Sequence, residues 1–99
     1  MRRVSFHPLA ERELNDSARY YEFESPGLGR AFLDAVEKTC ASICEHPHAG
    51  ATVVGTIRRR RIRRFPYALL YAVHPESIRV LAAMNLKRRP LHWVGREQD

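Results

Sequence analysis

The sequence predicts an α+β fold, in which two helices pack on one face of a mainly antiparallel sheet. Two observations predict it. Apolar residues recur at helical spacing through the first half of the chain, and they alternate through the second half. A run of helices followed by a run of strands is typical of α+β domains. The 99 residues, 44% hydrophobic and 28% charged, accommodate one core, so we expect a single domain over residues 1–99.

The first elements are a short strand and a helix. Residues 3–6 alternate, with Val4 and Phe6 on one side. Pro8 suits the first turn of a helix, where its missing N–H costs nothing. An apolar stripe follows at spacings of four, four and three: Ala10, Leu14, Ala18 and Tyr21.

A second helix follows the Ser25-Pro26-Gly27 turn and starts at Leu28 or Gly29. Its stripe is Phe32, Val36, Cys40 and Ile43. Because the link is short, the two helices are predicted to form an antiparallel helical hairpin.

The second half predicts a three-stranded antiparallel meander. Residues 46–56 are expected to be a loop, and a basic strand is expected over residues 57–64. Residues 67–73 are apolar on both faces, as in a central strand, and residues 78–85 form the last strand. The sheet face opposite the helices is expected to be open and to serve as the binding surface.

Charge is segregated along the chain, whose net charge is +6. Residues 1–50 hold six Lys/Arg and eight Asp/Glu, a net −2, whereas residues 51–99 hold eleven and three, a net +8. A basic half indicates a face that meets nucleic acid or an acidic protein; the alternative is a solvated basic surface, and arginines at a sheet edge also oppose unwanted strand pairing.

Motifs for cofactor or metal chemistry are not recognisable. His46 and His48 lack a second cluster of ligands, so neither a metal nor a cofactor is expected. Gly27-Leu28-Gly29 lacks the Lys and Ser/Thr of a phosphate-binding loop and is better interpreted as the hairpin turn. No apolar run approaches the ~20 residues that a membrane helix needs, and a cytoplasmic protein is expected.

A metal-independent ribonuclease is chemically compatible with these residues. Cleavage through the 2′-OH needs proton transfer and cations around the phosphate. Arg59, Arg61 and Arg79 are candidates for the charge, and His92 for the proton transfer. The alternatives are solvated or carboxylate-paired arginines and a histidine that only flanks Trp93.

The sequence resembles the ParE/RelE superfamily of type II toxin–antitoxin (plasmid stabilisation) systems, and is closer to ParE. The resemblance covers nearly the whole chain, and it rests on the order and spacing of these motifs taken together: Phe6-His7-Pro8, Glu13-Leu14, Tyr20-Tyr21-Glu22, Ser25-Pro26-Gly27-Leu28-Gly29, Arg59, Phe65-Pro66-Tyr67, Tyr71 and Arg89-Pro90-Leu91-His92-Trp93.

The resemblance implies a toxin bound by a cognate acidic antitoxin whose flexible segment folds on binding. ParE-like members poison DNA gyrase, whereas RelE-like members cut mRNA on the ribosome; an inactive, antitoxin-binding member is a third alternative. A toxin–antitoxin heterotetramer is also implied. Residues expected to contact the target or partner are Arg58, Arg59, Arg61, Arg63, Arg88, Arg89 and Trp93.

Two positions depart from the ParE pattern. Asn85 stands where many ParE-like chains have His, and His92 stands where they have Tyr. The first difference puts a role for that position in doubt. The second removes an aromatic group and adds one that can transfer protons, which keeps the RelE-like activity as an alternative.

Overall fold

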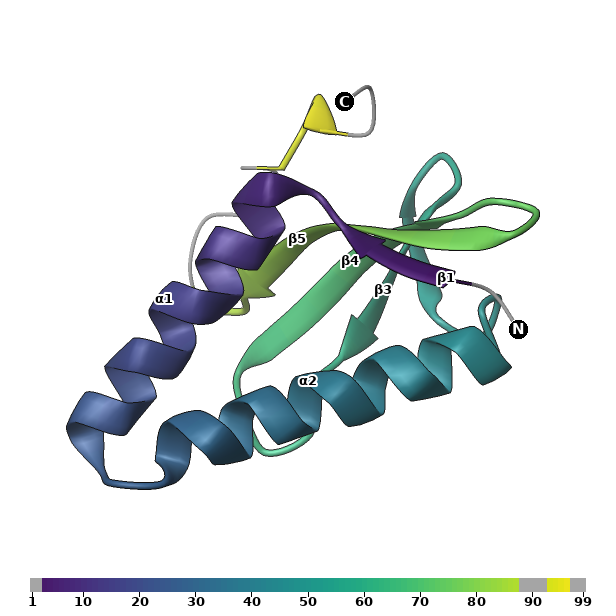
Figure 1. The fold of residues 1–99 in the computed structure, drawn as a ribbon. Coiled ribbons are helices and arrows are strands. Elements are labelled where there is room, and N and C mark those ends of the chain that lie inside the picture. The colour runs from purple at the N-terminus through teal and green to yellow at the C-terminus, as the bar shows by residue number, and fades with distance from the viewer. Residues whose placement is uncertain (1–2, 88–92, 97–99) are drawn as a thin grey trace.

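The computed structural model describes residues 3–87 and 93–96 (Figure 1). Within them, two helices pack against a five-stranded sheet, which confirms the α+β fold. The elements in chain order are β1 (Arg3–Phe6), α1 (Pro8–Glu24), α2 (Leu28–Glu45), β2 (Ala51–Val54), β3 (Ile57–Arg61), β4 (Tyr67–Val73) and β5 (Ser77–Asn85).

The sheet has the strand order β1-β5-β4-β3-β2. The strands from β2 to β5 form an antiparallel meander, and β1 pairs with β5 in parallel. The predicted loop over residues 46–56 is therefore wrong in part, because Ala51–Val54 is an edge strand. Every residue of β2 is exposed, so it has no buried face that an apolar pattern could reveal.

The basic strand is shorter than predicted. It ends at Arg61 rather than at residue 64, and Ile62 and Phe65 enter the helix-side core from the loop between β3 and β4. Ile57, at the other end of the strand, belongs to a core cluster on the opposite face. This change of face explains why the apolar residues of the segment do not alternate regularly.

The hairpin between the helices is secured from both sides. Glu22 of α1 accepts hydrogen bonds at 3.1 Å from the backbone N–H groups of Gly27 and Gly29, next to the N-terminus of α2. A Cβ on Gly29 would lie 2.5 Å from the carbonyl oxygen of Ala18, so only glycine allows this approach of the helices. The interpretation of the glycines as a hairpin turn is confirmed (Figure 1).

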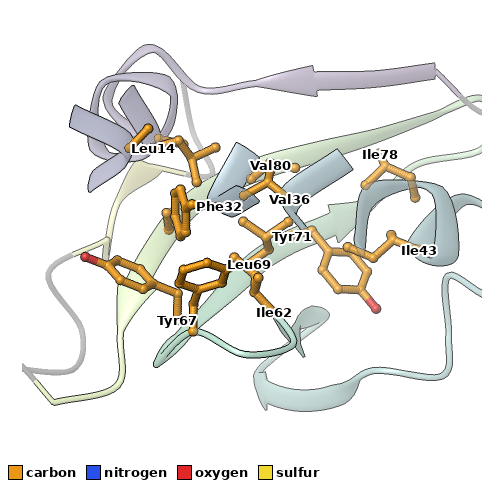
Figure 2. Close-up of a cluster of buried hydrophobic side chains, with 14 residues drawn as sticks. Leu14, Phe32, Val36, Ile43, Ile62, Tyr67, Leu69, Tyr71, Ile78 and Val80 are labelled. Atoms are coloured by element: carbon orange, nitrogen blue, oxygen red, sulfur yellow. The ribbon is translucent and has the colours of Figure 1, made fainter. Parts of the chain in front are cut away.

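The larger core lies between the helices and the sheet (Figure 2). Phe32 of α2 is fully buried, and its ring centroid lies 5.1 Å from that of Phe65 and 5.2 Å from that of Tyr67. Tyr71 is also buried and donates a 2.9 Å hydrogen bond to the carbonyl of Pro47. β4 is buried along nearly its whole length and lies in the middle of the sheet, as predicted.

A second, smaller core covers the opposite face of the sheet, which we call the far face. Its buried residues are Ile57, Leu70, Ala72, Leu81, Ala82 and Trp93. The expectation that this face is open is therefore wrong in part. Because β4 and β5 are apolar on both faces, the far face needs a cover, and the indole of Trp93, 1% exposed, supplies part of it.

Among the described residues, no helix combines the length and the apolar character needed to cross a membrane.

Candidate partner-binding surface

The alternation of β3 divides its arginines between the two faces of the sheet. Arg58 pairs with Tyr71, which belongs to the helix-side core, and Arg59 pairs with Leu70 of the far face. Paired residues in neighbouring strands project to the same side. Arg58 and Arg60 therefore project toward α2, whereas Arg59 and Arg61 belong to the far face.

The two arginines toward α2 hold the backbone that follows this helix. Arg58 Nη1 donates to the carbonyls of His48 and Gly50 at 3.0 and 2.7 Å. Arg60 donates to Ser42 Oγ at 2.7 Å and to the carbonyl of His46 at 2.8 Å. The carbonyl of His46 is that of the C-cap residue of α2, where positive charge is favourable, and the carbonyls of His48 and Gly50 belong to the loop that follows. Arg58, predicted as a contact residue, thus has a structural role.

The far face carries arginines on both sides of β4. Arg59 and Arg61 are exposed on β3. Arg79 of β5 pairs with Ala72, which places it on the same face, and its Nη1 donates to Ser5 Oγ at 3.3 Å and to the carbonyl of Phe6 at 3.2 Å. The three arginines that the sequence proposed for phosphate chemistry therefore share one face.

Several other predicted residues have different positions. Arg63 is exposed in the loop between β3 and β4. Trp93 is buried in the far-face core, so its side chain is not accessible to a partner in this conformation. Arg88, Arg89 and His92 lie outside the described residues.

The contact that holds Trp93 in place was not predicted. Arg96 donates two 3.0 Å hydrogen bonds to the two carboxylate oxygens of Glu13, and a third, at 3.2 Å, to the carbonyl of Leu81. Glu13 also accepts from the N–H of Ala83 at 3.1 Å. We call this arrangement the C-terminal clasp; residues 93–96 lie beside the start of α1 in Figure 1. A pair 83 residues apart leaves no local pattern in the sequence.

The clasp also satisfies backbone groups of the sheet. β1 pairs with β5 only as far as Val80, so the edge of β5 that follows is not covered by a strand. The carbonyl of Leu81 and the N–H of Ala83 lie on this part of β5, next to an irregular step in its pairing with β4. The ion pair supplies their hydrogen-bond partners, as an adjacent strand would do.

The thiol of Cys40 offers little reactivity. Burial, followed by smaller contributions from Cys44 and Glu37, raises the pKa of Cys40 to about 11. Cys40 is thus protonated at neutral pH, which makes it a poor nucleophile. In the part of the chain that the structure describes, no group of three or more His, Cys, Asp or Glu side chains is placed to hold a metal ion.

The helical hairpin on a mixed sheet, with its arginine-rich strand, is an architecture of the ParE/RelE-like toxins. Residues 4–88 match the family model described as "ParE toxin of type II toxin-antitoxin system, parDE", and the chain belongs to this family. The matched region ends before Trp93 and before Arg96, the C-terminal residue of the clasp.

A solved structure supports the same fold. A chain from the "Chromosomal ParDE TA system from P. aeruginosa" aligns with a TM-score of 0.64 and 15% sequence identity, over 87% of this chain and 97% of that one. A comparison with curated proteins found no match. The family resemblance of the sequence is confirmed.

Proposed function

We propose that this ParE-family toxin inhibits DNA gyrase in the cytoplasm and is neutralised by a cognate acidic antitoxin. Membership of the family of parDE toxins supports a toxin with an antitoxin. The observation that supports a protein target, rather than a chemical reaction, is the exposed arginine pair Arg59 and Arg61 beside an apolar core. Exposed arginines of this kind bind partners through charge complementarity.

The far face offers a protein partner the arginines that flank its buried core. Leu70 and Ala72 of β4 lie between Arg59 on one neighbouring strand and Arg79 on the other. Because these apolar residues are buried, the arginines are the accessible groups, and they add association rate and specificity. We further propose that antitoxin-bound toxin assembles as a heterotetramer.

A ribosome-dependent endoribonuclease is the second candidate function. It is favoured by one observation, that Arg59, Arg61 and Arg79 share the far face and could stabilise a charged phosphorane-like transition state. RNA cleavage also needs a base and an acid close to these arginines. Its candidate proton-transfer group, His92, lies outside the described residues.

The test compares DNA supercoiling by purified gyrase, with and without the protein, and mRNA cleavage in a translating ribosome assay. We expect inhibited supercoiling and intact mRNA. Arg59→Glu reverses an exposed far-face charge and should weaken inhibition roughly tenfold, since a reversed interface charge costs on the order of 1–2 kcal/mol. Arg19→Glu, an equal charge change at an exposed position of α1, is the control.

Cleaved mRNA with unaffected gyrase would reverse the ranking of the two functions. Equal loss of inhibition in Arg59→Glu and Arg19→Glu would show that only net charge matters and would exclude the far face as the contact.

A further inference from the structure

A groove separate from the far face runs between α2 and the loop that joins β3 to β4. It encloses about 740 Å³. Among the described residues, five cationic residues line it, against the single acidic residue Asp34: Lys38, Arg60, Arg61, Arg63 and Arg64. We call it the basic groove. Only Arg61, at the end of β3, is shared with the far face.

The positive charge of the basic groove is not neutralised from within. Asp34 is already engaged by Arg30, whose Nε and Nη2 lie 3.0 Å from its Oδ1, and Arg30 does not line the groove. Arg60 is held by Ser42 and His46, neither of which supplies a carboxylate. Among the described residues, none of the five cations forms an ion pair. The groove therefore retains a strong attraction for anions.

The backbone at Arg64 adds an independent observation. Its φ of +74° lies in the left-handed region, the only such value for a non-glycine residue in the described part of the chain. An ordinary L-residue pays about 1 kcal/mol there, a cost that glycine avoids. The guanidinium carbon of Arg64 lies 5.6 Å from the ring centroid of Phe65, a cation–π distance. The chain thus keeps a basic side chain beside the groove at a backbone position that favours glycine.

We propose that the basic groove binds an acidic polypeptide segment, one that places Asp or Glu side chains along α2. If the proposed function is correct, this segment belongs to the antitoxin. The charge selects an anionic partner, and arginine forks pair with carboxylates in bidentate geometry. The helix contributes Ala31, Ala35 and Thr39 to the groove wall, and these short side chains leave space for a chain that lies against them.

Nucleic acid fits the basic groove less well. Proteins that hold a single strand stack its bases on aromatic side chains, and none lines this groove. A rigid duplex is convex and contacts the rim of a concave groove rather than its interior. A flexible polypeptide can enter and place carboxylates against several cations at once.

The experiment measures fluorescence anisotropy of a labelled synthetic peptide in which Glu alternates with Ala, with polyuridylate of equal length in parallel. The double variant Arg63→Glu, Arg64→Glu should lose roughly tenfold or more in peptide affinity, because two cations become repulsive. The double variant Arg12→Glu, Arg19→Glu changes net charge equally on α1, which does not line the groove, and should lose much less.

Arg64→Gly separates binding from folding. Glycine relieves the left-handed backbone, so thermal stability should be maintained or rise, whereas peptide affinity should fall. Three results would overturn the proposal: equal losses in both double variants, unchanged affinity in Arg64→Gly, or polyuridylate that binds more tightly than the peptide with the same dependence on the groove.

Failure of the proposed function leaves a different signature. If the chain does not inhibit gyrase but the acidic peptide still binds through Arg63 and Arg64, the proposal of the basic groove is supported and gyrase is excluded as the target. If gyrase is inhibited and the peptide does not bind the groove, the proposed function is supported and the proposal of the basic groove is wrong.

Discussion

The two faces of the sheet are built by different means. Among the described residues, the helix-side core contains fourteen buried residues, contributed by the two helices, the two strands β4 and β5, and the loop between β3 and β4. The far-face core contains six of the described residues, and among these only Trp93 comes from outside the sheet. The helices that cover the first face are adjacent in sequence, whereas the cover of the second is secured by a pair 83 residues apart.

This difference separates stability from recognition. A large core tolerates little change, since each buried side chain contacts many others. The far face has a small core with exposed arginines beside it, and substitution of these arginines should leave folding nearly unchanged. The fold thus assigns most of its stability to one face and leaves charged groups free to act on the other.

The largest effect should come from Phe32→Ala, on the helix side. Removing a fully buried ring leaves a cavity and should lower the free energy of unfolding by about 3–5 kcal/mol. Urea denaturation followed by circular dichroism measures the loss. Phe23→Ala is the matched control, because Phe23 is 94% exposed and should change stability by less than about 0.5 kcal/mol. Comparable losses in the two variants would contradict the assignment of the core.

Trp93→Ala tests the cover of the far face. We expect a loss of about 2–4 kcal/mol, smaller than for Phe32, because Trp93 covers one side of a thin core and neighbouring chain can relax over it. Denaturation of this variant should be compared with that of Val94→Ala, whose side chain is 63% exposed. A Trp93→Ala protein as stable as the wild type would show that the far face does not depend on the indole.

Glu13→Gln tests the C-terminal clasp. The amide can still accept from the N–H of Ala83, but it loses the charge that pairs with Arg96, and about 1–2 kcal/mol should be lost. Hydrogen exchange should also accelerate at the amides of residues 93–96. Glu24→Gln removes an exposed carboxylate at the end of α1 and is the control. If the exchange rates stay unchanged, the ion pair does not hold the segment.

The smallest effect concerns the thiol of Cys40 on the helix side. Because its pKa is raised to about 11, iodoacetamide modification should be slow at pH 8 and should increase until about pH 11. The raised pKa favours the protonated folded state, so its stabilising contribution should be lost as the pH rises toward that value. Mass spectrometry of a Cys44→Ser variant, whose other thiol is absent, gives the rate. A rate that levels off near pH 8.5 would mean that Cys40 is not buried.

The sequence predicted the helix-side half of the molecule well. The stripes from Ala10 to Ala18 and from Phe32 to Ile43 are buried in the main, and the Ser25–Gly27 turn links the helices. These features depend on residues a few positions apart, which the period of a helix brings to one face. β4 was placed in the centre correctly because its apolar residues occupy both of its faces.

The candidate site was predicted less well, because its arrangement depends on contacts between residues that are far apart in the chain. Six arginines in a run of seven residues indicate a basic segment, but they do not indicate the face of the sheet to which each side chain projects. In the structure, Arg58 and Arg60 bond to groups at and after the end of α2, whereas Arg59 and Arg61 are exposed. The exposed strand β2 has no periodic pattern to detect. Neither the basic groove nor the clasp could be read from neighbouring residues.

Local patterns in this chain determined the two helices, the turn between them, the central strand and the basic character of the second half. Only the tertiary structure decided that β1 joins β5 in parallel, that Trp93 covers the far face, that Glu13 meets Arg96, and that the arginines divide between anchoring α2 and facing solvent. The physical reason is distance along the chain. Periodicity reports which side a residue projects to, whereas strand order and long-range pairing follow from how all the apolar faces are buried together.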